Sequence, residues 1–272
     1  MSESARILNE QQAAAAFDKQ SALFDGIYSE NTIIQYKRDR VIAHTEQFIN
    51  PGSKILELNS GTGEDAIYFA SEGHYVHATD ISEGMQQILA RKIISGDPGQ
   101  KITLELCSFT DLENIQNKGP YDLIFSNFAG LNCTGALDKV LHSFSALLKP
   151  GGIATLVILP EFCLWETLLL FKGKFKTAFR RFFSRKGTKA HIEGKFFTCW
   201  YYNPSYIKKH LPGFNTLSIE GLCVFVPPSY IEGFAEKYPK SFSFLKKLEY
   251  KLKTSRFWRS VGDYYIITLR KK

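Results

Sequence analysis

Apolar residues fall into short runs separated by amphipathic segments along the first 160 residues of the chain. Residues 54–58 (Lys-Ile-Leu-Glu-Leu) form an apolar run that ends at a turn-forming cluster, which is typical of a buried strand. Strand and helix patterns then alternate, which predicts βαβ units and a parallel sheet with helices on both faces. The predicted strands are 54–58, 75–79, 101–106, 121–126 and 153–159, and the predicted helices are 5–24, 30–49, 63–73, 82–95 and 135–148.

The alternation stops after residue 160. Leu and Phe residues recur on one helical face over residues 162–184, which predicts a single amphipathic helix, with Gly173 as a possible interruption. The other elements predicted here are a short helix between Pro204 and Pro212, a strand at 215–226, a helix at 229–252 and a strand at 263–270. We expect four regions: N-terminal helices at 1–50, a ligand-binding core at 51–160, a basic amphipathic cap at 161–212 and strands and a helix that complete the sheet at 213–272.

A glycine-bearing turn follows the first predicted strand. It contains Asn59, Gly61 and Gly63, and it leads directly into the next predicted helix. Ligands of open α/β sheets bind at the carboxyl ends of strands, and glycine lets a ligand approach the backbone, while Asn tolerates left-handed conformations. Asp80 closes the next strand, 17 residues after Gly63, where a carboxylate can accept both ribose hydroxyls of an adenosine. The spacing Gly61-x-Gly63-x-x-Ala66 also fits a dinucleotide fingerprint, so an NAD(P)-dependent oxidoreductase remains an alternative.

Four segments carry a more specific pattern, in the order LELNSGTGED at 56–65, DISEGM at 80–85, YDLIFSN at 121–127 and LKPGG at 148–152. Together with the late DYYIITLR segment at 263–270, they resemble class I S-adenosylmethionine-dependent methyltransferases, in the small-molecule branch that includes ubiquinone-biosynthesis-like enzymes. The resemblance implies an α/β fold: a doubly wound, seven-stranded, Rossmann-like sheet whose last strand is antiparallel. A helical cap rich in aromatic and basic residues would be inserted after the fifth strand.

The resemblance also implies S-adenosylmethionine as cofactor and a role for each matching position. Glu57 would lie near the methionine amino group, Asp80 would bind the ribose, and Ser108 stands where an Asp commonly binds the adenine amine. The residues predicted at the cofactor are Glu57, Asn59, Gly61, Gly63, Asp80, Ile81, Met85, Ser108, Phe109, Asn127 and Phe128, with Tyr36 and Arg40 of the preceding helix for its carboxylate. Tyr36 and Arg40 could equally belong to an ordinary solvated basic face.

The charge pattern agrees with a cationic cofactor. No Lys or Arg occurs between residues 55 and 90, whereas the turn supplies Glu57, Glu64 and Asp65. A sulfonium is favoured by carboxylates and aromatic faces, while a pyrophosphate would need positive charge.

Candidate acid–base groups are few. Methyl transfer is an in-line displacement in which positioning supplies much of the rate, although an oxygen or nitrogen acceptor can also need a base. We interpret His191, Tyr201 and Asn132 as the candidates, with an ordinary surface-loop histidine as the alternative for His191. The aromatic residues, densest after residue 160, favour a small apolar or aromatic acceptor.

The net charge of +7 is concentrated in one segment. Residues 161–195 hold nine Lys or Arg against three Glu. A cap over the active site explains the amphipathic segment 162–184, and the alternative is peripheral membrane contact, because basic helices rich in Phe and Leu lie on membrane surfaces. A non-catalytic cofactor-binding adaptor at a membrane is a further alternative, and a nucleic-acid partner is not expected.

The five cysteines show no ligand spacing, and the N-terminus has no signal-peptide pattern. We therefore expect no metal site, no disulfide framework and a cytoplasmic location, with peripheral membrane contact as the alternative.

Overall fold

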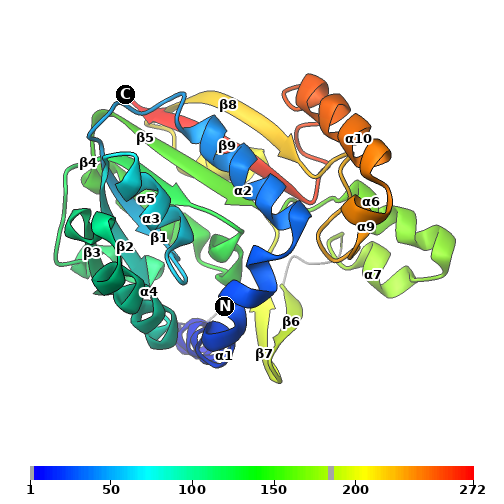
Figure 1. Ribbon diagram of the computed structural model, residues 1–272. Helices are drawn as coiled ribbons and strands as arrows, with labels where there is room; N and C mark the ends of the chain where they lie inside the picture. Colours follow the sequence, from blue (N-terminus) through cyan, green and yellow to red (C-terminus); the bar gives the residue numbers. More distant parts are fainter. Residues whose placement is uncertain (1–2, 183–186) are drawn as a thin grey trace.

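A seven-stranded sheet in the order β3-β2-β1-β4-β5-β9-β8 forms the centre of the computed structural model, which describes residues 3–182 and 187–272 (Figure 1). Strands β1 to β5 run parallel, and β9 lies antiparallel between β5 and β8. The strands are β1 Lys54–Leu58, β2 Tyr75–Asp80, β3 Ile102–Leu106, β4 Tyr121–Ser126, β5 Leu148–Ile158, β8 Phe214–Leu222 and β9 Tyr264–Lys271. The predicted doubly wound α/β sheet is confirmed.

Helices cover both faces of this sheet. The α-helices are α1 Glu3–Ser29, α2 Thr32–Thr45, α3 Glu64–Ser71, α4 Glu83–Ser95, α5 Leu137–Leu147, α6 Leu164–Leu168, α7 Phe175–Phe179, α8 Pro204–His210, α9 Phe234–Lys237 and α10 Pro239–Leu252. The 3₁₀ helices are η1 Asp97–Lys101, η2 Phe109–Asn114, η3 Gly130–Cys133 and η4 Leu169–Lys172. A separate hairpin joins β6 Thr188–Ile192 to β7 Lys195–Cys199. None of the helices in the described part of the chain combines the length and apolar character needed to cross a bilayer.

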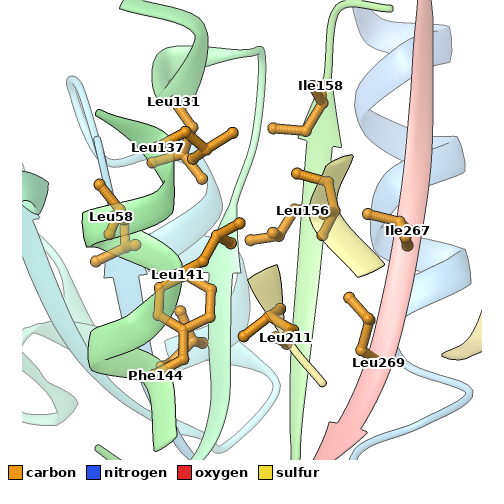
Figure 2. Close-up of a cluster of buried hydrophobic side chains, with 14 of the residues drawn as sticks. Leu58, Leu131, Leu137, Leu141, Phe144, Leu156, Ile158, Leu211, Ile267 and Leu269 are labelled. Carbon is orange, nitrogen blue, oxygen red and sulfur yellow. The ribbon is translucent and has the colours of Figure 1, made fainter. Parts of the chain in front are cut away.

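The strands divide their side chains between two cores because successive residues point to opposite faces. Leu56 and Leu58 join the core beneath α5 and α8, whereas Ile55 joins the core beneath α2, α3 and α4. Figure 2 shows Leu141 and Phe144 of α5 in the first of these cores, beside the inward side chains of the strands. Burial of each such side chain contributes about 1.5–3 kcal/mol. The two cores therefore hold the helices against the sheet, and the site is built at one edge of this sheet.

The segment after β5 differs from its prediction. The single helix expected over 162–184 is instead α6, η4 and α7, and residues 183–186 lie outside the described residues. Gly173 adopts a left-handed φ of 70°, which ends η4 and turns the chain before α7. The result is an excursion, residues 161–182, which projects from the sheet at the right of Figure 1.

Two further predictions beyond this excursion were wrong in detail. The strand predicted to residue 226 ends at Leu222, because the following backbone N–H groups bond to a carboxylate rather than to a neighbouring strand. The helix predicted over 229–252 begins at Phe234 and is divided between α9 and α10, because the residue before Pro239 is disfavoured in a helix. The β6–β7 hairpin was not predicted.

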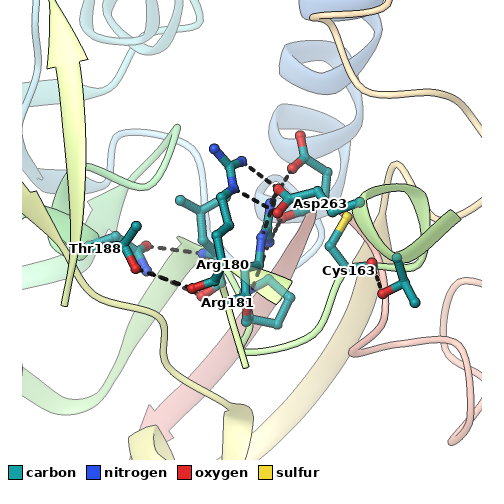
Figure 3. Close-up of polar contacts among 10 residues, drawn as sticks. Cys163, Arg180, Arg181, Thr188 and Asp263 are labelled. Carbon is teal, nitrogen blue, oxygen red and sulfur yellow. Dashed lines mark hydrogen bonds and ion pairs between the residues drawn. The ribbon is translucent and has the colours of Figure 1, made fainter. Parts of the chain in front are cut away.

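An ion-pair cluster fastens the base of the excursion to β9 (Figure 3). The guanidinium of Arg181 donates to Glu166 at 2.6 Å and to Asp263 at 2.8 Å, and Arg180 donates to Glu166 through two nitrogens at 2.5 and 2.7 Å. Cys163, Glu166 and Asp263 offer three potential metal ligands within 4.8 Å of one another. Because Arg181 already bonds to both carboxylates, we interpret the group as a structural ion-pair cluster.

Candidate functional site

A pocket opens at the carboxyl ends of β1 and β4, where the strand order reverses. The crossovers that leave these two strands depart in opposite directions, which creates a crevice above the sheet edge. The predicted cofactor residues that line it are Asn59, Gly61, Asp80, Ile81, Met85, Ser108, Phe109, Asn127 and Phe128. They come from segments after β1, β2, β3 and β4, so the topology brings together residues that are distant in sequence.

The turn after β1 has the left-handed geometry expected from its sequence. Asn59 has a φ of 51° and Gly61 a φ of 55°. The amide of Asn59 donates to the carbonyl oxygen of Asn127 at 3.0 Å and accepts from the hydroxyl of Ser126 at 2.6 Å. Asn59 therefore ties the end of β1 to the end of β4 while its backbone turns toward the pocket.

Gly63 lies behind this turn rather than in the pocket lining. Its φ is 81°, and it occupies the N-cap position of α3. A Cβ atom at this position would stand 2.1 Å from Leu89 Cδ1. Glycine is required here both for the backbone angle and for the close packing of α3 on α4.

Asp80 is held in position by backbone groups. Its two carboxylate oxygens accept from the N–H of Gly61 at 2.9 Å and from the N–H of Ser82 at 2.8 Å. Burial raises the pKa of Asp80, while these two hydrogen bonds favour its charged form. A carboxylate oxygen has more than one acceptor direction, so Asp80 can still accept from hydroxyl groups of a ligand.

Acidic groups gather beside the pocket, at the end of β1 and in the first turn of α3. Glu57 is buried, and its Oε2 has no hydrogen-bond partner among the described residues. Its pKa is raised well above the usual range, first by burial and then by the neighbouring charge of Asp65. Asp65 accepts from Arg38 at 2.6 Å and from the side-chain amide of Asn127 at 2.9 Å. Asp65 lines the pocket, whereas Glu57 is buried outside the lining, behind Asp65.

Helix α1 forms a roof over the pocket that the sequence analysis missed. Glu10, Ala13, Phe17 and Phe24 line the cavity from this helix. Their spacings of three, four and seven residues place them on one helical face, which is the pattern that could have identified them. Asp18 of the same helix accepts from Ser82 Oγ at 2.5 Å and from the N–H of Gly84 at 2.9 Å. These bonds join the roof to the start of α4.

Comparison with known proteins identifies the type of domain formed by residues 55–152. Residues 55–152 match the model of a methyltransferase domain. Over 144 residues the chain is 30% identical to demethylmenaquinone methyltransferase of Clavibacter sepedonicus. The aligned region covers 52% of this chain and 55% of that protein. Residues 55–152 therefore form a methyltransferase domain, as the sequence motifs predicted. The chain spans only 55–57% of the length of the demethylmenaquinone methyltransferases that it matches.

Solved structures share the fold of this chain over most of its length. The Burkholderia thailandensis 1,6-didemethyltoxoflavin-N1-methyltransferase, with S-adenosylhomocysteine bound, is 15% identical with a TM-score of 0.57, and 96% of this chain and 88% of that one are covered. The [4+2]-cyclase SpnF is 16% identical with a TM-score of 0.62, and 97% and 96% of the two chains are covered. At these identities the likeness concerns the fold.

Two residues predicted at the cofactor, Tyr36 and Arg40, lie outside the pocket lining, and that prediction is corrected. The hydroxyl of Tyr36 donates to Glu249 at 3.0 Å, and Arg40 pairs with Glu220 at 3.1 Å. These contacts turn both side chains toward β8 and α10. Arg38 lies on a different face of α2, and it lines the pocket with its guanidinium 5.0 Å from the ring centre of Phe128.

The three catalytic candidates also lie outside the pocket lining. His191 is exposed on β6 beside Phe196, at a ring distance of 4.5 Å. Tyr201 is buried, which raises its pKa, and its ring faces Arg181 at 5.1 Å. Asn132 is fully buried and bonds to the backbone of Leu159 and Trp200, so both ends of its amide are occupied. These contacts tie Tyr201 and Asn132 into the surrounding structure, and none of the three candidates lines the pocket.

Proposed function

We propose that this chain transfers the methyl group of S-adenosylmethionine to a small-molecule acceptor. The observation that carries the proposal is Asp80, positioned by two backbone N–H groups at the edge of a pocket that opens beside the turn at Gly61. A carboxylate fixed in this way suits the two hydroxyls of a ribose. The matched methyltransferase domain at 55–152 contains both residues.

The acidic groups at the end of β1 and the start of α3 support a cationic cofactor. Glu57 presents a buried carboxylate oxygen without a partner among the described residues, which fits the ammonium group of a methionine moiety. Arg38 lines the pocket and is held by Asp65, so it replaces Tyr36 and Arg40 as the candidate for the carboxylate of that moiety. The bound cofactor would supply the electrophilic methyl group, and the chain would orient it.

We infer an apolar or aromatic acceptor from the aromatic residues that line the pocket. Phe17, Phe24 and Phe128 line the cavity together with Ala13. Aromatic rings provide a large apolar surface for a flat ligand and attract the positive charge of a sulfonium. The relatives named demethylmenaquinone methyltransferases support a quinone-like compound as the first acceptor to test.

Isothermal titration of S-adenosylhomocysteine tests the cofactor site. We expect wild-type protein to bind with a Kd of about 1–100 μM, and Asp80→Ala to weaken binding at least about tenfold. Asp39→Ala is the matched control, because Asp39 is an exposed carboxylate of α2. Absence of binding by the wild-type protein would overturn the proposal.

Formation of S-adenosylhomocysteine from S-adenosylmethionine with a demethylated quinone then tests transfer itself. Binding without this product for any acceptor would favour a cofactor-binding role without methyl transfer.

A second proposal concerns the excursion at 161–182: it contacts the surface of an anionic membrane. Phe171 is 89% exposed and Phe175 is 63% exposed, and Lys174 and Lys176 are exposed beside them. Exposed aromatic rings between cationic side chains are suited to the boundary between headgroups and acyl chains.

Co-sedimentation with vesicles of phosphatidylglycerol and phosphatidylcholine tests this contact. We expect binding at low salt that is reduced in the double variant Phe171→Ser, Phe175→Ser. Phe257→Ser is the control, because Phe257 is 70% exposed outside the excursion. No binding by wild-type protein at low salt would exclude the membrane role.

A further inference from the structure

Glu10 of α1 is a buried acid that lines the pocket beside the end of β3. Its exposed fraction is 8%, and it lies against the first residues after β3. Its Oε2 accepts from Ser108 Oγ at 3.0 Å and from Thr110 Oγ1 at 2.8 Å. Its Oε1 is buried and has no hydrogen-bond partner among the described residues. The site therefore contains an acceptor oxygen held ready by two hydroxyl donors.

The direction of the pocket indicates which part of a ligand meets this oxygen. Asp80 ends β2 and is the candidate ribose partner, and the sheet continues from β2 to β3. A nucleoside whose ribose lies at Asp80, and whose methionine moiety lies toward β1 and β4, must place its base toward β3. Ser108 and Phe109 lie there, and Glu10 lies on the roof above them.

We propose that Glu10 Oε1 accepts a hydrogen bond from the exocyclic amine of adenine, an inference that rests on the cofactor site proposed above. An ionised carboxylate only accepts hydrogen bonds, and the adenine amine only donates them. Ser108 has no carboxylate of its own to offer, and its hydroxyl instead orients Glu10. Recognition of the base thus comes from the N-terminal helix, and adenine binding connects the roof to the β3 end of the sheet.

Binding of nucleoside analogues measures this recognition directly. S-inosylhomocysteine carries a carbonyl oxygen in place of the amine, so it would set an acceptor against Glu10. The N6,N6-dimethyladenosyl analogue keeps the nitrogen but has no N–H. We expect wild-type protein to bind S-adenosylhomocysteine about 10- to 100-fold more tightly than either analogue, because an acceptor facing an acceptor, or a blocked donor, leaves the buried oxygen unpaired.

The variant Glu10→Gln replaces the acceptor oxygen that faces the base with an NH₂ donor. Ser108 and Thr110 would still donate to its amide oxygen, so the amide NH₂ would face the base. We expect weaker binding of S-adenosylhomocysteine, unchanged or tighter binding of S-inosylhomocysteine, and a preference between the two that falls at least about tenfold. Glu30→Gln, an exposed substitution just after α1, is the control and should keep the wild-type preference.

The outcomes separate the two proposals. If wild-type protein binds none of these ligands, the cofactor site itself is wrong. If it binds all three equally, or if Glu10→Gln keeps the wild-type preference, the cofactor site stands and the role of Glu10 is overturned. The wild-type comparison needs no variant, so the test remains decisive even where Glu10→Gln fails to fold.

Discussion

Glu249 of α10 is the carboxylate on which the end of β8 depends. Its side chain is fully buried, and it accepts hydrogen bonds from consecutive backbone N–H groups. The donors are Cys223 at 2.9 Å and Val224, Phe225 and Val226 at 3.0 Å each. Sheet pairing has ended by this point, so Glu249 replaces the neighbouring strand as the partner of these groups. We predict that Glu249→Gln, which changes almost no volume, strongly destabilises the protein.

The size of the effect follows from the geometry. A glutamine can direct its oxygen at Val224, Phe225 and Val226, but its NH₂ then opposes the N–H of Cys223. The buried N–H of Cys223 loses its partner at about 1–3 kcal/mol, the hydroxyl of Tyr36 loses the same acceptor, and the remaining bonds lose their charge assistance. Arg40, 3.5 Å from Glu249, also loses an ion-pair partner but keeps Glu220. We therefore expect a loss of about 3–5 kcal/mol in the free energy of unfolding.

Urea denaturation followed by tryptophan fluorescence measures this loss as a lower transition midpoint at an unchanged slope. The control is Glu232→Gln, the same substitution at an exposed position, for which we expect a change within about 0.5 kcal/mol. A loss below about 1 kcal/mol for Glu249→Gln would show that this region re-satisfies its N–H groups without the carboxylate, and the reasoning would be refuted.

Three further results follow from other parts of the structure. Gly63→Ala should lower the stability by at least about 2 kcal/mol, because φ is 81° and the added Cβ would meet Leu89 at 2.1 Å; a thermal midpoint equal to that of wild type would contradict this. The raised pKa of Glu57 means that the folded state holds a proton which the unfolded chain has lost, so stability should fall as pH rises above the usual glutamate range, and urea midpoints of Glu57→Gln should lack that fall. Arg181→Met should cost about 3–5 kcal/mol because it leaves Glu166 buried with Arg180 alone, and a near-neutral urea midpoint would contradict this.

The sheet and the cofactor turn were predictable because their causes are local. A five-residue apolar run such as 54–58, followed by turn-forming residues, is typical of a buried strand. A turn that requires positive φ favours residues such as Asn59 and Gly61. Strand order then brings the ends of β1 to β4 together without further information. The predicted residues that line the pocket lie at or just after these strand ends, except Met85, which lies in the first turn of α4.

Helix orientation was less predictable, because periodicity defines a face without saying what covers it. Tyr36 and Arg40 share a face of α2. The carboxylates that bind this face, Glu220 and Glu249, come from β8 and α10, which are distant in sequence. Likewise, the stripe over 162–184 satisfied helical spacing while Gly173 ended the helix. In both places a contact or a backbone angle outweighed a correct local pattern.

The α1 side of the pocket was hidden for the same reason, because long-range hydrogen bonds hold it in place. Asn9 of α1 donates to the carbonyl oxygens of Cys133 and Thr198 and accepts from the N–H of Thr198 at 2.6 Å. One side chain thus joins the roof, a pocket-lining residue of η3 and the β6–β7 hairpin, segments up to 189 residues apart. A change in the hairpin would therefore alter the pocket through α1, which also carries Glu10, while leaving Asp80 and the turn after β1 in place.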